Sequence, residues 1–301
     1  MKVLITGASG MLGRYLHTLL GRDHEVTTLQ RADADICCDL RVATPPLAGR
    51  RFDLVVHAAG TQEEAEALSV NRDGTIHLLA ALEENPPRGL VFVSSWEVYS
   101  PDSGENVGED HQLWASTKVG QSKALAEGLV AEWCKRYGVV LTIVRPARMF
   151  GKGVKGEMAR LFSDVAASRY IHVRDNDARL SLICASDVAE AIAGLHPAGG
   201  IYNLTDGRDA RWIELADALS ANCGLSKRQI FLPEKWAQAA WKYARWVPAV
   251  KASLSPATLA RRSKTLTLST EKITSALPAW HPYKAIDVIA RKDKDYPYED
   301  R

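Results

Sequence analysis

Apolar and polar positions follow two different periods through the first half of the chain. Short apolar, β-branched runs predict buried strands at Lys2–Thr6, Glu25–Leu29, Asp53–His57, Gly89–Val93 and Val139–Val144. Helical spacing between these runs predicts helices at Arg14–Leu20, Glu63–Leu68, Asn71–Glu84 and Ser122–Tyr137. Strands that alternate with helices in this way indicate a parallel sheet with helices on both faces. Ligands of such sheets bind at the carboxyl ends of the strands.

The pattern becomes less regular after Pro146. Helical spacing recurs at Gly156–Arg169, Asp187–Leu195 and Arg211–Ala221, and strand-like runs recur at Tyr170–Val173 and Ile201–Leu204. We expect Gly156–Arg169, Tyr170–Val173 and Arg211–Ala221 to belong to a smaller unit of mixed α/β type.

Three glycines follow the first predicted strand at a spacing of three residues. Gly7 permits the tight turn out of the strand, Gly10 lets the backbone approach a pyrophosphate, and Gly13 lets the next helix pack closely on the sheet. The amides of Met11 and Leu12 then lie at a helix N-terminus, which favours an anion. A glycine trio alone is weak evidence, but its place between the first strand and a helix predicts a dinucleotide-binding loop.

The fold predicted from these patterns is α/β, a doubly wound parallel sheet of the Rossmann type with a small mixed α/β C-terminal substrate domain. We assign residues 1–150 to the dinucleotide-binding domain and expect residues 178–204 to return to it. Residues 151–177 and 205–301 are assigned to the substrate-binding domain.

The overall charge argues against a strongly charged partner. The 301 residues include 38 Lys and Arg and 36 Asp and Glu, which leaves a net charge of +2, so we expect neither nucleic acid nor a membrane as a partner. The five cysteines show no metal-ligand spacing, so we expect no metal site and reduced thiols. Because the phosphate-binding strand begins at residue 2, we expect no signal peptide, and no apolar run is long enough to span a bilayer. These features predict a cytoplasmic protein.

One segment is rich in tryptophan. Lys235–Val247 is amphipathic and contains Trp236, Trp241 and Trp246. The plainer interpretation is the core of the second domain, and the alternatives are a substrate wall or a membrane-facing patch. The polar end Lys292–Arg301 is expected to fray.

Several segments from Met1 to about Pro282 together resemble the extended short-chain dehydrogenase/reductase superfamily, specifically its NAD-dependent epimerase/dehydratase family. The motifs occur in the family's order. They are Thr6–Gly13, Asp39–Leu40, Val56–Gly60, Val70–Thr75, Val93–Tyr99, Arg145–Pro146, Asp187–Ala189, Tyr202–Leu204 and Ala279–Pro282.

The resemblance implies three catalytic residues. Ser95 takes the place of the catalytic Ser or Thr, and Lys123 takes the place of the lysine that holds the cofactor ribose. Glu97 completes a Ser-x-Glu that resembles the Ser/Thr-x-Glu of nucleotide-sugar dehydratases and decarboxylases, in which the Glu does acid/base work. The implied cofactor contacts are Gly7, Ser9, Gly10, Met11, Leu12, Gly13, Arg31, Asp39, Leu40, Ala58, Ala59, Gly60, Asn71, Ser94, Lys123 and Pro146.

The tyrosine that serves as acid/base in this superfamily is missing. Val119–Glu127 is similar to the family's Tyr-Gly-x-Ser-Lys-x-x-x-Glu, with Val119 at the tyrosine position. A rival register, which places Trp114 and Lys118 at the Tyr and Lys positions, matches fewer flanking residues. Neither the isopropyl group of Val119 nor the indole of Trp114 can both donate and accept a proton, as a phenol does.

Three consequences stay open at this point. The family's chemistry is lost, or another group supplies the proton, or a different reaction occurs at the same site. The groups that could supply the proton are Glu97, Tyr99, His111 and a water held by Ser95 and Lys123.

The end of the second predicted strand bears on the cofactor. NAD-preferring members usually place an Asp or Glu here, which bonds both ribose hydroxyls, whereas this chain has Gln30 followed by Arg31. Loss of the acid removes repulsion from a 2′-phosphate, and a guanidinium can pair with that phosphate. NADP(H) is therefore favoured over NAD(H), unless Asp33 or Asp35 reaches back to the ribose.

The resemblance implies an NAD(P)-dependent epimerase/dehydratase-like oxidoreductase with a nucleotide sugar as its small-molecule substrate. Arg179 lies one position from the place where sugar-nucleotide members carry a phosphate-binding Arg. The missing tyrosine favours an alternative, an NADP(H)-binding sensor without catalysis. The tryptophan-rich segment favours another, a hydroxysteroid or lipid dehydrogenase-like enzyme. The helix Ser122–Tyr137 is a candidate surface for a homodimer.

Overall fold

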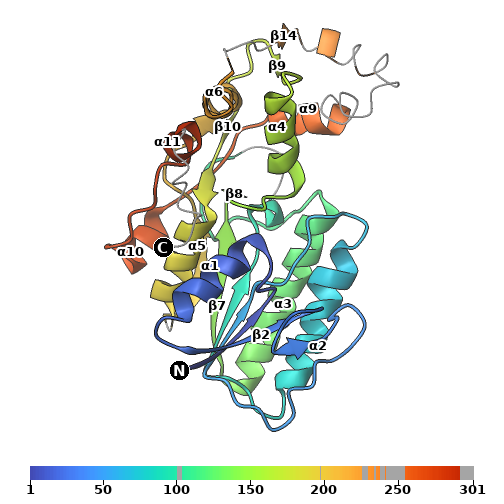
Figure 1. Cartoon of the computed structure of the whole chain (residues 1–301), viewed down its shortest axis with the longest axis vertical. Coiled ribbons are helices and arrows are strands. Elements are labelled where there is room, and N and C mark those ends of the chain that lie inside the picture. Colours follow the sequence, from blue (N-terminus) through green and yellow to red (C-terminus); the bar gives the residue numbers. More distant parts are fainter. Residues whose placement is uncertain are drawn as a thin grey trace.

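The structure of the chain, a computed structural model, describes residues 1–99, 104–196, 198–225, 230–233, 235–237, 241 and 255–291. Its main feature is a seven-stranded parallel sheet with the strand order β12-β7-β5-β4-β1-β2-β3 (Figure 1). The chain first builds outward from β1 and then restarts on its other side at β4, which is the topology of the predicted doubly wound fold. The strands are β1 Lys2–Thr6, β2 Glu25–Gln30, β3 Ile36–Cys37, β4 Leu54–His57, β5 Gly89–Val93, β7 Val140–Pro146 and β12 Gly200–Leu204.

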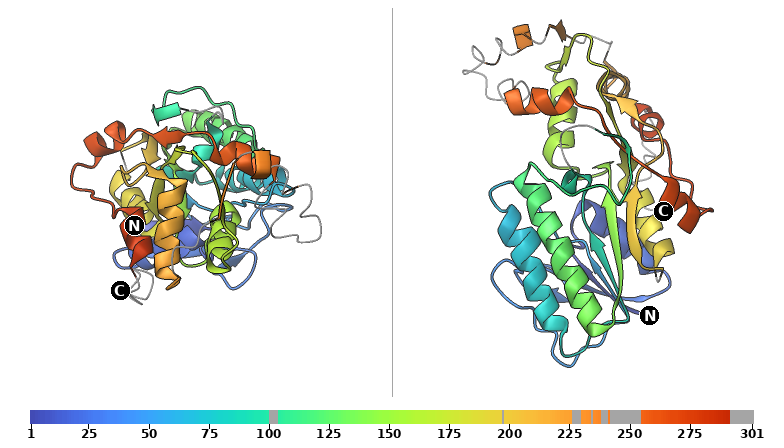
Figure 2. Two further views of the ribbon diagram at one scale, coloured as in Figure 1. Left: turned by 90° about the horizontal axis from the view of Figure 1, so that it is seen from above. Right: turned by 180° about the vertical axis from the view of Figure 1, so that it is seen from behind.

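Alternate residues of the strands feed two separate cores. In β1, Val3 and Ile5 point into one cluster and Leu4 points into the other. The first cluster is covered by α1 (Met11–Leu20) and α5 (Ala185–Leu195). The second cluster is covered by α2 (Gly74–Leu82) and α3 (Lys118–Tyr137), and Figures 1 and 2 show these pairs on opposite faces of the sheet. Because both faces are buried, the central strands β1, β4 and β5 are mostly apolar.

The loop between β1 and α1 depends on two glycines. Gly7 has a φ of +73°, and a Cβ on it would lie 2.7 Å from the Cα of Ala59. A Cβ on Gly13 would lie 2.1 Å from the carbonyl oxygen of Gly7. Since both obstacles are backbone atoms that cannot step aside, only glycine lets α1 start this close to the sheet.

A second, four-stranded sheet has the order β13-β10-β15-β6 and gathers distant parts of the chain. Its strands are β6 Gly104–Val107, β10 Arg179–Leu180, β13 Ala210–Arg211 and β15 Leu266–Leu268. Two short parallel pairs lie beside it, β8 Arg148–Phe150 with β11 Leu182–Cys184 and β9 Ile171–Val173 with β14 Ile230–Leu232. A separate apolar core, centred on Phe150, Leu161 and Trp212, lies among the helices of this part. These helices are α4 Gly156–Ala166, α6 Trp212–Asn222 and α11 Ala285–Ala290. Leu259 of α9 (Pro256–Arg262) packs instead in a smaller cluster with Ala237.

Two buried aspartates attach residues 280–285 to the rest of the molecule. Asp187, near the start of α5, accepts hydrogen bonds from the Trp280 indole through its carbonyl (3.1 Å) and from the Tyr283 amide through Oδ2 (3.0 Å). Asp206, just after β12, accepts from the Ala285 amide (2.6 Å). Burial raises the pKa of Asp187 to about 7.

The main predicted elements are confirmed, with shifts at their ends and one error. Residues 64–66 form turns, where a helix over Glu63–Leu68 was predicted. The following segment begins as a π-helix, η1 (Leu68–Asp73), and continues into α2. α3 begins at Lys118, four residues before the predicted start, because Thr117 caps it by accepting a hydrogen bond from the Gly120 amide (2.9 Å). The predicted helix at 156–169 ends at residue 166, and Trp246 and residues 292–301 lie outside the described residues.

We expect Gly13→Ala to lower the free energy of unfolding by about 1–3 kcal/mol, because the added methyl meets fixed backbone atoms. Gly128→Ala on α3 is the matched control, since a Cβ there meets nothing within 4 Å, and it should raise stability by up to ~1 kcal/mol. Urea unfolding of both variants measures the difference. Equal effects at the two positions would contradict the close approach of α1.

Candidate active site

The residues predicted to bind cofactor or do chemistry gather at the carboxyl edge of the main sheet. They lie just beyond β1, β2, β3, β4 and β5, at the end of β7, or on η1 and α3 beside this edge. The fold therefore brings together residues up to 139 positions apart, Gly7 and Pro146 among them. This is the edge at which doubly wound sheets bind their ligands.

The N-terminus of α1 is shaped to receive an anion. In the described part of the chain no side chain caps this helix, whose N-cap is Gly10. The Ser9 amide donates to Oε1 of Gln30 (2.7 Å), and the Gln30 amide group donates to the carbonyls of Ala32 and Asp33 (3.0 and 2.9 Å). Gln30 thus holds the phosphate-binding loop against the end of β2. Among the described residues, no side chain pairs with the first amides of α1, which suit an anion.

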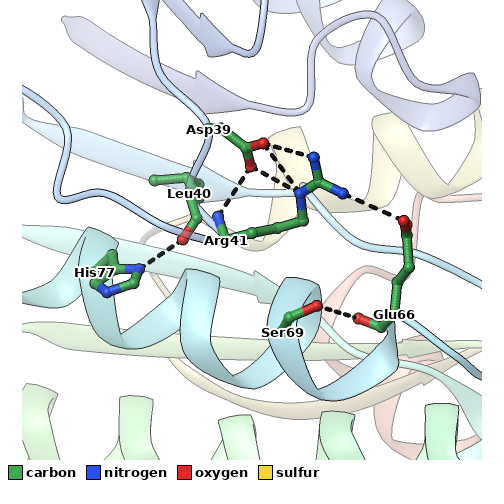
Figure 3. Close-up of polar contacts among 6 residues, drawn as sticks. All are labelled: Asp39, Leu40, Arg41, Glu66, Ser69 and His77. Carbon is green, nitrogen blue, oxygen red and sulfur yellow. Dashed lines mark hydrogen bonds and ion pairs between the residues drawn. The ribbon is translucent and has the colours of Figure 1, made fainter.

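The residues beyond β3 take part in a network of hydrogen bonds and ion pairs, which Figure 3 shows in detail. Nε and Nη2 of Arg41 donate to the Asp39 carboxylate at 2.7–3.0 Å, and Nη1 reaches Glu66 (3.2 Å). Hydrogen bonds from Arg41 hold the pKa of Asp39 below its usual range, and the charge of Arg31 acts in the same direction. The Leu40 carbonyl accepts a hydrogen bond from Nδ1 of His77 (2.6 Å). Asp39, one of the implied cofactor contacts, is therefore already paired with Arg41.

Asp35 is not directed back toward the ribose position. Its carboxylate accepts hydrogen bonds from the amide and the hydroxyl of Thr28, both at 2.8 Å, and these bonds lower its pKa. Arg31 is exposed at the end of β2. Asp33 is exposed there as well, so a guanidinium and a carboxylate both reach solvent beyond this strand.

Lys123 is buried at the end of β5. Its Nζ donates to the Val93 carbonyl (2.8 Å), and burial lowers its pKa to about 8. A Cβ on Gly60 would lie 2.9 Å from this Nζ, so the glycine leaves room for the lysine. Asn71 lies in the π-helix and donates to the Ser122 hydroxyl (2.9 Å), one residue before Lys123. Single π-turns of this kind are frequent at functional sites.

Ser94, Ser95 and Glu97 form the platform beyond β5. The Ser94 hydroxyl is buried and has no hydrogen-bond partner among the described residues. Ser95 Oγ accepts from the Glu97 amide (3.1 Å), which leaves its own proton for another acceptor. The Glu97 carboxylate accepts from the Thr117 hydroxyl (2.8 Å). Two hydroxyl groups and a carboxyl group thus come from four consecutive residues beyond β5.

The aromatic candidates for the missing tyrosine do not lie on this platform. Val119 is 2% exposed, and Trp114 of the rival register is 68% exposed on the loop before α3. The Tyr99 hydroxyl donates to Asn203 (2.7 Å) and accepts from Arg145 (2.9 Å). Burial raises the pKa of Tyr99, so this phenol is a structural group and a poor acid/base.

A buried ion pair anchors the platform. Arg145 on β7 donates to the Glu127 carboxylate of α3 through Nε and Nη2, at 3.0 and 2.7 Å. Its Nη1 donates to the Tyr99 hydroxyl and to the Glu109 carbonyl, both at 2.9 Å. The guanidinium thereby ties α3, β7 and the segment after β5 to one another.

Three arginines gather on the side of the platform that faces the second sheet, and we call Arg148, Arg261 and Arg262 the arginine cluster. The Arg148 guanidinium lies 3.7 Å from the ring centre of Trp96, the residue between Ser95 and Glu97. Arg262 is 6% exposed, and its Nε is buried without a hydrogen-bond partner among the described residues. Both guanidinium groups lie 5.3 Å from the ring centre of Trp212.

Two carboxyl groups face these arginines, and their pKa values are shifted in opposite directions. Burial alone would raise the pKa of Glu157, but Arg148, Arg262 and Arg261 outweigh it and lower the pKa, so this group is ionised. Glu157 pairs with Arg148 at 3.4 Å. Burial and the nearby Glu157 raise the pKa of Glu97. The cluster thus has more positive charge than its carboxylates neutralise, and that excess favours an anionic ligand.

Sequence reasoning missed several of these groups. Arg148 follows Arg145–Pro146 by two residues, and this spacing from a family motif was a usable signal. Arg41 was not identified as a site residue, because nothing in the sequence shows that it pairs with Asp39. Glu157 and Arg262 had no signal, since only the packing of α4 and α9 brings them to Trp96 and Trp212.

Further features of the described residues limit the chemistry. No group of three or more His, Cys, Asp or Glu side chains in the described ranges could hold a metal ion. All five cysteines lie in these ranges, and none is part of a disulfide. None of the described helices is both long and apolar enough to cross a membrane.

Comparison with known proteins agrees with this geometry. The sequence profile of the NAD dependent epimerase/dehydratase family matches residues 3–204. A dTDP-4-dehydrorhamnose reductase from Streptomyces griseus is 33% identical over 228 residues, covering 71% of this chain and 73% of the relative. An N-acetyl-alpha-D-glucosaminyl-diphospho-ditrans,octacis-undecaprenol 4-epimerase from Escherichia coli O157:H7 is 28% identical over 252 residues, covering 77% of this chain and 75% of the relative. A crystal structure of UDP-galactose 4-epimerase superimposes with a TM-score of 0.76 at 18% identity, over 99% of both chains.

We expect Glu127→Gln to lower the free energy of unfolding by about 3–5 kcal/mol, because it leaves the Arg145 guanidinium buried without its counter-charge. Glu132→Gln, at an exposed position on the same helix, is the control and should change stability by less than about 0.5 kcal/mol. Chemical denaturation at neutral pH measures both. A small loss at Glu127 would contradict an anchoring role for the pair.

Proposed function

Since the chain belongs to the NAD dependent epimerase/dehydratase family, we propose that it is an NADP(H)-dependent oxidoreductase acting on a sugar joined to a diphosphate, most simply a nucleotide sugar. The observation that carries this proposal is the arginine cluster beside Ser95 and Glu97. A diphosphate supplies the charge that the cluster lacks, and guanidinium groups bind phosphate oxygens bidentately. The two relatives named above are also described as acting on diphosphate-linked sugars.

The residues at the carboxyl edge suit a dinucleotide cofactor. The uncapped N-terminus of α1 can hold its pyrophosphate, and the buried Ser94 hydroxyl offers a hydrogen bond beside the nicotinamide position. Such a cofactor, when bound, accepts or donates a hydride. Lys123 is held at this edge by the Val93 carbonyl and can reach a ribose hydroxyl.

Glu97 is proposed to take over the proton transfer that a tyrosine performs in the family. Its raised pKa keeps a proton on the carboxyl group closer to neutral pH than in an ordinary glutamate. Ser95 would orient the substrate oxygen, and Glu97 would give that oxygen a proton during reduction and remove one during oxidation. Thr117 steadies the carboxyl group by its hydrogen bond.

The preference for NADP(H) is proposed from the end of β2. Gln30 is neutral and engaged with the phosphate-binding loop, Asp35 is engaged with Thr28, and Arg31 is exposed. Arg41 adds a second guanidinium on the neighbouring strand end, where it neutralises Asp39. These charges suit a 2′-phosphate better than a free ribose hydroxyl.

Two further proposals concern the cellular location and the oligomeric state. We place the protein in the cytoplasm, where its cofactor and a nucleotide sugar are found together. Leu125, 51% exposed on α3, lies on the surface that we propose for a homodimer.

We expect NADPH to bind at least about tenfold more tightly than NADH, and Arg31→Ala to remove most of that difference. NADH binding should be unchanged in this variant, because only the 2′-phosphate contact is lost. Arg50→Ala, in the exposed loop before β4, is the control and should leave both affinities unchanged. Calorimetric titration measures all six affinities, and a preference for NADH in the wild type would contradict the cofactor proposal.

We expect Glu97→Gln to lower kcat by about 10²-fold or more in a nucleotide-sugar assay with NADPH, with little change in NADPH affinity. For reduction, the wild-type kcat should fall as pH rises through the Glu97 pKa, because the acid must be protonated, and the variant should lose this limb. Glu84→Gln, at an exposed position after α2, is the control.

A second candidate function is favoured by the buried valine at the tyrosine position. If wild type binds NADPH but turns over no sugar diphosphate, while Val119→Tyr gains hydride exchange, the role of Glu97 is wrong. The protein is then an NADP(H)-binding sensor in which the family's chemistry has been lost.

A further inference from the structure

A buried histidine lies between the phosphate-binding loop and α2. His57, the last residue of β4, is 1% exposed. Its Nδ1 lies 2.7 Å from the hydroxyl of Thr6 at the end of β1, and its Nε2 lies 2.9 Å from the hydroxyl of Thr75 on α2. Both hydroxyl groups belong to fully buried residues. The two ring nitrogens are therefore engaged by two different elements, away from water.

The neighbouring groups determine which ring nitrogen of His57 carries the proton. The Thr75 hydroxyl donates to the carbonyl of Asn71 (2.6 Å), so it accepts from Nε2–H of His57. Burial lowers the pKa of His57 to about 3, so the ring is neutral and its Nδ1 is an acceptor. The Thr6 hydroxyl donates to this Nδ1, and its oxygen accepts from the Ala59 amide (3.1 Å). A neutral imidazole thus satisfies both partners at once.

The Thr6 end of this arrangement reaches the phosphate-binding loop. Thr6 is followed directly by Gly7, at which the chain turns out of β1 with a φ of +73°. The Ala59 amide is held by the same hydroxyl that donates to His57, and a Cβ on Gly7 would lie 2.7 Å from the Cα of Ala59. Nδ1 of His57 thereby helps to fix the start of the loop against the segment beyond β4. The cofactor pyrophosphate is proposed to bind at this loop.

The Thr75 end reaches Lys123 through Asn71. The Asn71 carbonyl is held by Thr75, and the Asn71 amide group donates to the hydroxyl of Ser122 (2.9 Å), the residue before Lys123. A Cβ on Gly60 would lie 3.1 Å from Oδ1 of Asn71 and 2.9 Å from Nζ of Lys123, so these two side chains meet at the same glycine. Holding the Asn71 backbone therefore also limits where Lys123 can lie.

We propose that His57 is a positioning residue with two separate tasks: Nδ1 holds the phosphate-binding loop for cofactor binding, and Nε2 holds Asn71, and with it Lys123, for hydride transfer. An imidazole suits this position because its two nitrogens are a donor and an acceptor at different places on one rigid ring. The inference rests on the proposed function, since it assigns cofactor binding to one nitrogen and turnover to the other. A residue that only filled space would affect both properties together.

Two substitutions separate the two nitrogens. In His57→Asn the amide oxygen replaces Nδ1, and in His57→Gln the amide nitrogen replaces Nε2. We expect His57→Asn to keep NADPH affinity within about twofold and to lower kcat in a nucleotide-sugar assay by about tenfold or more. We expect His57→Gln to weaken NADPH binding by about tenfold and to keep kcat at saturating NADPH within about threefold. His281→Asn and His281→Gln, at an exposed position, are the matched controls and should change neither value.

Amide hydrogen exchange of the full-length protein supplies a readout that needs no turnover. His57→Asn should speed exchange in residues 71–76 and leave residues 7–13 unchanged, and His57→Gln should do the reverse. Thr75→Val and Thr6→Val each remove one hydroxyl at nearly constant shape, so they should reproduce the Asn and the Gln pattern respectively. These two variants decide the question if a histidine variant does not fold.

Two results would overturn the proposal. The first is a loss of NADPH affinity and of kcat in the same proportion in both His57 variants, and the second is the same exchange pattern in both. If the wild type turns over no sugar diphosphate, the proposed function fails, whereas the exchange patterns and the NADPH affinities still decide the role of His57.

Discussion

The buried pair of Glu127 and Arg145 holds the site together. Glu127 lies one helical turn after Lys123, so fixing its carboxylate on β7 also fixes the face of α3 that presents the lysine. The other end of the guanidinium reaches Tyr99, which follows Ser95 and Glu97 along the chain. One desolvated charge pair therefore sets the distance between the two halves of the site. Such a pair tolerates little change, because either partner left alone would be a buried, uncompensated charge.

The sequence was informative wherever local rules decide the structure. The glycine spacing, the strand alternation and the family motifs gave the main sheet, and they placed Ser95, Glu97, Lys123 and the phosphate-binding loop on one edge. Helix starts were less certain, since the first turn of α3 depends on its cap at Thr117. The second sheet escaped prediction because its strands are two to four residues long and pair across distant segments. The arginine cluster was not predicted either, because Arg148 and the two arginines of α9 are brought together from distant segments.

Burial disfavours the charged forms of two groups in the site, and buried arginines lie close to them. Burial pushes Glu97 toward its neutral form and lowers the pKa of Lys123, so both groups are less firmly charged than on a surface. Next to them, the guanidinium groups of Arg148 and Arg262 are buried against the rings of Trp96 and Trp212. Burying these groups without a ligand costs free energy. A ligand with negative charge at one end and a neutral reacting group at the other would lower that cost.

The pairing of β6 with β15 has a consequence for how the site is assembled. The Asn106 amide donates to the Thr267 hydroxyl across 161 positions, and this contact closes one of the longest loops in the protein. During synthesis, the platform at Ser95 is complete long before Arg261, Arg262 and β15 leave the ribosome. The dinucleotide half can therefore fold first, and the side with the arginines is added only when the chain is almost finished. The proposed binding of an anionic substrate by the arginine cluster thus requires a chain that is almost finished.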